Sequence, residues 1–244
     1  MGEYWENVKR HVKFGRKETF QILLASILMG VMFSFDDGRE KFSMAYWIGN
    51  FLLFFAIVLV SMLFRVLVQK MVATKTGYRV EFKVWNFGLA IGIMLTVLTN
   101  GKLILLIPGG IAFYHLAADR LGHFRYGLNY STCGWIASVG SIANIVLGMF
   151  FKEIMKQSGL ASGLLDRFIY VNFLLALFLF LPLPPLDGLM MFFGTRLGYM
   201  FIFGGIFGYV ALYLAQVYSL ILAVIIAVVT WGAFFILFER EAGL

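Results

Sequence analysis

Long apolar runs separated by short polar connections are the feature that most restricts how this chain can fold. A helix needs about 20 apolar residues to cross a bilayer. The chain is 61% hydrophobic, whereas soluble domains contain roughly 45–50% apolar residues. The sequence therefore predicts an all-α polytopic membrane protein with about six transmembrane helices. The apolar runs occupy residues 19–35, 46–73, 86–117, 133–151, 168–193 and 197–238.

Two of these runs do not fit a single membrane span. The run at 197–238 is about twice the length of one span, so we expect it to fold back near residues 216–219 as two helices. The run at 86–117 is interrupted by Asn100-Gly101-Lys102 and Pro108-Gly109-Gly110. Its pieces are too short to cross a membrane alone, which predicts a re-entrant or interfacial element with room for short strands.

The distribution of charge predicts the orientation of the chain. The net charge is +7, but the Lys and Arg residues flank apolar runs rather than clustering with aromatic residues, so we expect membrane lipid and no nucleic acid as a partner. The basic first 17 residues precede a run without a small-residue cleavage site, which indicates a retained first span. An N-terminus and C-terminus in the cytoplasm place 14 of the 20 Lys and Arg residues inside and five outside. The five are Arg39, Lys41, Lys152, Lys156 and Arg167.

The segment Leu181-Pro-Leu-Pro-Pro-Leu-Asp-Gly188 places a carboxylate beside three of the chain's four prolines inside an apolar run. The prolines must break a membrane helix, and such a break is tolerated only where protein or water satisfies the freed backbone groups. An ionisable residue at this depth indicates a functional site by default. Asp187 is therefore the first candidate site residue.

Three segments resemble, in order and spacing, the motifs of the site-2 proteases, a family of intramembrane zinc metalloproteases. These are Phe64–Ala73 followed by Gly77-Tyr78, then Gly140–Asn144, then Phe178–Gly188. The resemblance covers about residues 46–193, and Pro-Pro-Leu-Asp-Gly is its most specific part. It divides the chain into a basic segment with the first span (1–45), a site-2-protease-like core (46–193) and a C-terminal helical pair (194–244).

The departures from the family pattern fall on its catalytic residues. In the register of this chain, Arg65 and Gln69 stand at the two His positions of H-E-x-x-H, and Val66 stands at the position of the general base. Arg has no lone pair for a metal and Val cannot move a proton. Of the three zinc ligands that the resemblance implies, only Asp187 remains. Ser141 also replaces the Pro of the Asn-containing helix, and Leu179 stands where the family often has Asn.

We therefore expect a pseudoprotease without catalytic residues, metal or other cofactor, which binds transmembrane segments or a membrane partner through a retained cleft at Asn144, Pro184 and Pro185. The alternative is an intramembrane metalloprotease with a non-standard or partner-completed zinc site. Transport is a weaker third class, because no repeated halves are evident.

The resemblance brings positions 65 and 187 together, so the guanidinium of Arg65 can replace the metal cation and pair with Asp187. Two simpler roles remain open at this point: Asp187 can cap the helix after the prolines, and Arg65 can extend to the membrane interface. A separate metal site from His115, Asp119 and His123 is less favoured than ordinary polar roles for these residues. For Asn144, an interhelical hydrogen bond is an equally good explanation. Gly204 and Gly208 predict close helix packing.

Overall fold

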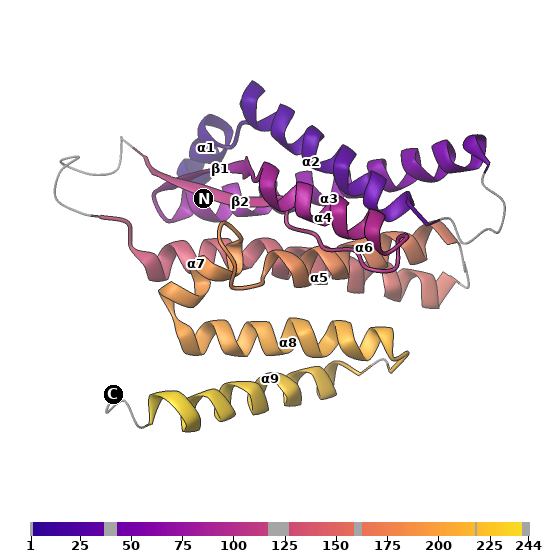
Figure 1. Ribbon diagram of the computed structural model, residues 1–244. Coiled ribbons are helices and arrows are strands. Elements are labelled where there is room, and N and C mark those ends of the chain that lie inside the picture. The colour runs from indigo at the N-terminus through magenta and orange to yellow at the C-terminus, as the bar shows by residue number, and fades with distance from the viewer. Residues whose placement is uncertain (1, 37–42, 117–126, 159–162, 218, 241–244) are drawn as a thin grey trace.

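The computed structural model of the chain describes residues 2–36, 43–116, 127–158, 163–217 and 219–240. The fold is mostly helical and is arranged in three layers that are stacked from top to bottom in Figure 1. The upper layer holds α1 (Gly2–His11), α2 (Arg16–Ser34), α3 (Met44–Lys75), α4 (Asn86–Leu98) and a small sheet. The middle layer holds α5 (Tyr130–Ser158), α6 (Gly163–Leu179) and α7 (Asp187–Gly194). The lower layer holds α8 (Arg196–Leu214) and α9 (Leu220–Phe234), which ends in a π-helical turn, Phe235–Glu239.

Five helices in the described ranges are long and apolar enough to cross a membrane, as expected for a polytopic membrane protein. They are α2, α3, α5, α8, and α9 with its terminal turn. The apolar run at 168–193 is divided at its prolines into α6 and α7, and the run at 197–238 folds back into α8 and α9 as predicted. In Figure 1, α1 and the last turn of α9 lie toward the same end of the helices.

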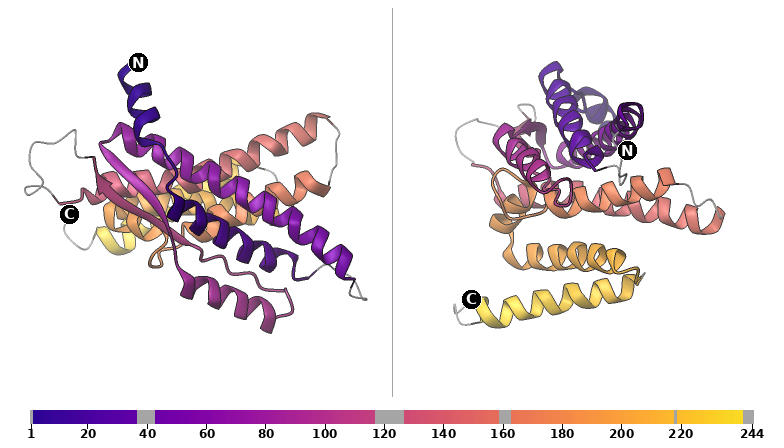
Figure 2. Two further views of the ribbon diagram at one scale, coloured as in Figure 1. Left: turned by 90° about the horizontal axis from the view of Figure 1, so that it is seen from above. Right: turned by 45° about the vertical axis from the view of Figure 1, so that its right-hand side comes forward.

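The main hydrophobic core lies between the upper and middle layers. Ile22, Met29, Val58 and Leu175, from α2, α3 and α6, are all fully buried in it. Figure 2 shows α2 lying along α3, with α5 and α6 crossing behind them. The helix α3 therefore reaches both the N-terminal helix and the helices that carry the proline motif, and this central place lets α3 supply side chains to the candidate site.

A two-stranded antiparallel sheet lies at one end of α3. Strand β1 (Tyr78–Val84) pairs with β2 (Gly109–His115), with Tyr78 opposite His115 and Val84 opposite Gly109. Alternate β1 side chains, those of Tyr78, Val80 and Phe82, are buried, as a half-buried strand requires. The interrupted run at 86–117 thus forms the short helix α4 and the strand β2. Strand β1 was not predicted, because it lies between the apolar runs at 46–73 and 86–117.

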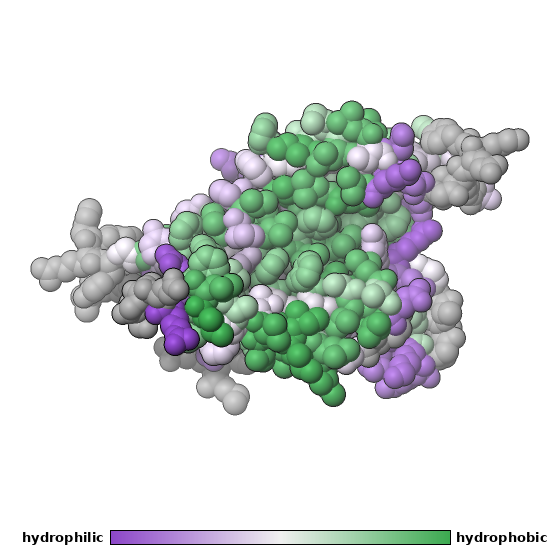
Figure 3. Space-filling model, turned by 60° about the horizontal axis from the view of Figure 1, so that its bottom comes forward, coloured by the Kyte–Doolittle hydropathy of each residue, from purple (hydrophilic) through white to green (hydrophobic). Residues whose placement is uncertain are grey.

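The lower layer is a helical hairpin that is joined through small residues. A Cβ atom added at Gly204 would lie 2.8 Å from Thr230 Cβ, and one at Gly208 would lie 2.9 Å from Ile226 Cγ2. The predicted close packing at these two glycines is therefore confirmed. Only 11% of the apolar stretch formed by α9 and its terminal turn is buried within the protein. Figure 3 shows a broad apolar face on this side of the molecule, with hydrophilic residues gathered at its edges, as a surface in contact with lipid requires.

Candidate functional site

The proline motif forms a compact turn between α6 and α7. Its backbone is held by a hydrogen bond from Leu183 N to Leu181 O (2.8 Å) and another from Leu186 N to Leu183 O (2.7 Å). The Pro184–Pro185 peptide bond is cis. Both of these prolines are exposed, whereas Leu186, Asp187 and Gly188 are buried. The turn therefore directs the carboxylate of Asp187 into the protein at the first residue of α7.

Asp187 meets two side chains of α3 inside the protein. Arg65 and Gln69 are one helical turn apart and share one face of α3. Asp187 Oδ2 accepts hydrogen bonds from Arg65 Nη2 and, at 2.6 Å, from Gln69 Nε2. Arg65 and Gln69 are fully buried and Asp187 is 2% exposed. The structure thus contains the Arg65–Asp187 pair, and it gives neither residue the simpler role: Asp187 caps no helix and Arg65 does not reach the surface.

Two backbone elements complete the surroundings of this cluster. Strand β2 donates a hydrogen bond from Ile111 N to Asp187 Oδ1 at 3.2 Å, and α5 accepts one at Ala137 O from Gln69 Nε2 at 3.0 Å. Both oxygens of Asp187 are therefore occupied by donors. Three elements, α3, α7 and β2, meet at this one carboxylate, and α5 is joined to it through Gln69.

Two glycines allow these elements to approach. A Cβ atom at Gly110 in β2 would lie 2.0 Å from Pro185 O, so the strand fits over the proline turn only without a side chain. A Cβ atom at Gly140 in α5 would lie 2.4 Å from Gln69 Nε2 and 2.8 Å from Arg65 Nε. The two polar side chains of α3 therefore fill the space beside a bare helix surface.

Several buried polar atoms near this cluster have no hydrogen-bond partner within the described ranges. They include Arg65 Nε and Nη1, Gln69 Oε1, Ser141 Oγ and both amide atoms of Asn144. Asn144 follows Gly140 by one helical turn and lies on the same face of α5. No described residue forms the interhelical hydrogen bond that was one of the two explanations for Asn144. Of the three predicted cleft residues, Asn144 is fully buried, whereas Pro184 and Pro185 are exposed.

The residues of this cluster do not fit a catalytic zinc ion. Such a site typically has three protein ligands and an open position. Here Asp187 is the single carboxylate, Arg65 has no lone pair to offer, and Gln69 directs its amide nitrogen at Asp187. Val66, at the general-base position, is fully buried in the main hydrophobic core. Within the described ranges, no group of three His, Cys, Asp or Glu side chains is placed to hold a metal.

The metal site from His115, Asp119 and His123, which the sequence disfavoured, has only one of its three residues within the described ranges. His115 ends β2, and its ring lies 5.1 Å from the ring of Tyr78. Asp119 and His123 lie outside the described residues.

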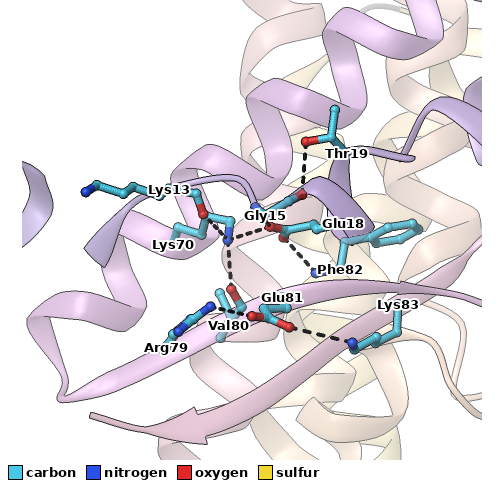
Figure 4. Close-up of polar contacts among 10 residues, drawn as sticks. All are labelled: Lys13, Gly15, Glu18, Thr19, Lys70, Arg79, Val80, Glu81, Phe82 and Lys83. Atoms are coloured by element: carbon cyan, nitrogen blue, oxygen red, sulfur yellow. Dashed lines mark hydrogen bonds and ion pairs between the residues drawn. The ribbon is translucent and has the colours of Figure 1, made fainter. Parts of the chain in front are cut away.

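A second buried ion pair joins α2 to α3 and was not predicted from the sequence. Lys70 Nζ lies 2.9 Å from Glu18 Oε2 (Figure 4), and only 3% and 4% of the two side chains are exposed. Lys70 Nζ also donates to Val80 O (3.0 Å) and Lys13 O (3.1 Å), and Glu18 Oε1 accepts from Phe82 N (2.9 Å). This pair ties the start of α2 and strand β1 to α3. The only signal in the sequence was a lysine directly after Gln69, near the end of an apolar run.

The fold and the site together define a multi-pass helical membrane protein with a buried Arg–Asp pair at a proline turn. Comparison with known proteins gives a distant relative: the chain is 26% identical over 183 residues to the Methanocaldococcus jannaschii protein named "Putative zinc metalloprotease MJ0611". The aligned region covers 72% of this chain and 83% of the relative. No protein-family model matches the chain, and no solved structure matches it.

Proposed function

We propose that this protein is a proteolytically inactive, site-2-protease-like membrane protein that binds transmembrane helices or a membrane partner. The proposal is carried by the way in which the carboxylate of Asp187 is bonded within the protein. Both of its oxygens accept hydrogen bonds from protein donors, and one of them is bound by the guanidinium of Arg65. In the site-2 protease pattern that this chain resembles, the position of Arg65 belongs to a metal-binding histidine.

Charge balance supports the exchange of a metal for an arginine. A carboxylate buried at membrane depth needs a compensating cation. The guanidinium of Arg65 supplies that positive charge beside Asp187. Strand β2 adds a backbone donor on the other oxygen, at Ile111. The site is thereby closed around a protein cation, and we propose that the surrounding helices are kept for binding rather than for peptide hydrolysis.

The alternative, an intramembrane metalloprotease whose site is completed in some other way, rests on the name of the Methanocaldococcus jannaschii relative. In that case a partner would have to supply ligands beside Asp187, and Arg65 would have to leave the carboxylate. The two functions differ in what they require of Asp187, which is structural in the first and metal-binding in the second.

Zinc content and cleavage of a reporter transmembrane substrate test the proposal together. We expect the wild-type chain to hold no stoichiometric zinc and to release no product, both purified and in its native membrane. A triple variant, Arg65→His with Val66→Glu and Gln69→His, restores the ligand pattern and is expected to gain zinc. Wild-type cleavage that disappears in Asp187→Asn, with contaminating proteases controlled, would overturn the proposal in favour of the enzyme.

The binding role needs its own test. A photo-crosslinking residue at Leu183, which is 42% exposed within the proline turn, is expected to capture an added transmembrane peptide. The same residue at Leu98 in α4, which is 69% exposed, serves as a matched exposed leucine outside the turn. Equal capture at both positions would show that the peptide only shares the bilayer or detergent with the protein.

We also propose that both termini lie in the cytoplasm. Two observations support this: the excess of Lys and Arg on that side, and the position of α1 and the last turn of α9 toward one end of the helices in Figure 1.

A further inference from the structure

We propose that the end of the helical bundle away from Asp187 holds a zwitterionic phospholipid, with its headgroup among the charged residues of α5 and α6 and one acyl chain between α5 and the α8–α9 hairpin. This inference does not depend on the proposed function. It rests on two adjoining cavities with different linings.

The first cavity, of about 580 Å³, lies where the C-terminal turns of α5 meet α6, α8 and the start of α9. Among the described residues, its charged lining consists of two cations, Lys152 and Lys156, and two anions, Glu153 and Asp166. Lys152 Nζ lies 5.0 Å from the ring centre of Tyr213 and 6.0 Å from that of Tyr209, so two aromatic rings hold its ammonium group at the cavity. A cavity with balanced charges of both signs complements a headgroup that carries both signs.

The second cavity, of about 260 Å³, is apolar and opens between α5, α8 and α9. Its lining includes Ile142, Ile145, Gly205 and Ala223. Met149, Tyr209 and Leu220 line both cavities, so the charged space continues into the apolar one. Ligand sites commonly combine an apolar lining with a few placed polar groups. A molecule with a charged head and a hydrocarbon tail matches a charged cavity that continues into an apolar one.

The position of the cavities relative to the membrane fits the same ligand. Lys152 and Lys156 lie in the last two turns of α5, at the polar end of a helix that is long enough to cross the bilayer. The apolar cavity lies nearer the middle of α5 and beside α9, most of which is exposed. A phospholipid places its phosphate and ammonium at the interface and its acyl chains toward the bilayer centre. The cavity linings change from charged to apolar in the same direction.

The charged residues that line the first cavity determine which headgroup groups it can bind. Lys152 and Lys156 are placed to bind the phosphate by charge-assisted hydrogen bonds, and Glu153 and Asp166 to bind a primary ammonium. We therefore assign phosphatidylethanolamine as the ligand class. An anionic phospholipid lacks the ammonium, so it would offer no cation to the two carboxylates.

Quantitative binding to the purified full-length chain tests the assignment. Phosphatidylethanolamine, phosphatidylglycerol with the same acyl chains, and soluble phosphoethanolamine are titrated separately, with bound lipid counted by native mass spectrometry. We expect one phosphatidylethanolamine per chain and affinity weaker by about tenfold or more for the other two ligands, because each lacks one set of contacts. Equal binding of phosphatidylglycerol would overturn the zwitterionic assignment, and equal binding of phosphoethanolamine would overturn the acyl-chain cavity.

Two variants test the headgroup contacts and the acyl-chain cavity separately. Lys152→Gln removes one phosphate contact, and Lys75→Gln, at an exposed lysine ending α3, is its control. Gly205→Leu fills the apolar cavity, since a Cβ atom there meets only Ala227 Cβ, at 3.6 Å. Gly232→Leu, where nothing lies within 4 Å, is the matched control in α9. We expect each test variant to lose about tenfold in affinity and each control to stay within about twofold. Test variants that bind like the wild type would refute the site.

Discussion

Arg65 on α3 and Asp187 on α7 form an ion pair across 122 positions of the sequence, with 0% and 1% of the two side chains exposed. Removing two charges from water costs several kcal/mol for each ion, and their attraction restores this only when the geometry and the further hydrogen bonds are good. Here the further bonds come from Gln69 and from the backbone of Ile111. The pair therefore fixes the position of α7 and β2 against α3.

The first prediction concerns the loss of one partner of this pair. Asp187→Ala leaves the guanidinium of Arg65 buried without a counter-charge, so the free energy of unfolding is expected to fall by about 3–5 kcal/mol. Reversible unfolding in mixed micelles measures it. Glu81→Ala is the control, because Glu81 pairs with Arg79, whose side chain is 53% exposed, and such surface pairs contribute about 0–1 kcal/mol.

A double variant shows what the pair contributes beyond its charges. Replacing both partners with apolar residues, Arg65→Met with Asp187→Leu, is expected to recover most of the stability lost in Asp187→Ala, because no charge remains buried. An Asp187→Ala protein as stable as the wild type would contradict the first prediction. A double variant no more stable than Asp187→Ala would show that packing, rather than charge, accounts for the loss.

A second prediction follows from the bare surface of α5 at Gly140. A Cβ atom there would lie 2.4 Å from Gln69 Nε2, so Gly140→Ala must displace Gln69 and Arg65 from Asp187. We expect a loss of about 1–3 kcal/mol in stability, the usual cost of overpacking. The control is Gly49→Ala in α3, where nothing lies within 4 Å. That change should stabilise the helix by up to about 1 kcal/mol, through helix propensity alone. The same loss in both variants would contradict the role of Gly140.

The sequence predicted those parts of the structure that depend on composition and on local chemistry. The apolar runs predicted the long helices, and the three prolines predicted the break before α7. The meeting of Arg65 with Asp187 was implied by the resemblance to the site-2 proteases, since two residues this far apart share no local pattern. The resemblance thus located the centre of the site, and the charges of the residues then suggested how they would pair.

The structural features that the sequence did not predict depend on tertiary contacts. Strand β1 alternates charged residues, Arg79, Glu81 and Lys83, with apolar ones, and it lies between the apolar runs from which the helices were predicted. Glu18 and Lys70 lie at the edges of apolar runs, where a charged residue ordinarily faces water. Their burial is caused by β1 packing across α2 and α3, which no local pattern reveals. That Asn144 has no hydrogen-bond partner among the described residues is likewise a property of the assembled helices.

A third prediction concerns the buried pair between α2 and α3. In Glu18→Gln the side chain can still accept from Phe82 N, but its amide nitrogen faces Lys70 Nζ, which leaves that ammonium without a counter-charge. We expect lower stability by about 3–5 kcal/mol and faster hydrogen exchange at the Phe82 amide. Thr19→Ala is the control, because the Thr19 hydroxyl bonds only the Gly15 carbonyl in the exposed turn beside it. Unchanged exchange at Phe82 would contradict a role of this pair in holding β1.

The last prediction tests the orientation of the chain in the membrane. Lys9→Cys, Arg240→Cys and Lys156→Cys place single thiols at exposed positions, and the native Cys133 is fully buried and should contribute little labelling. The excess of Lys and Arg in the segments assigned to the cytoplasm predicts that a membrane-impermeant maleimide labels Lys156→Cys in intact cells. It should label Lys9→Cys and Arg240→Cys only after permeabilisation. The wild-type chain measures the background from Cys133. Labelling of Lys9→Cys and Arg240→Cys, but not Lys156→Cys, in intact cells would reverse the orientation. Labelling of only one of the two termini would contradict the arrangement of α1 and α9 at one end of the bundle.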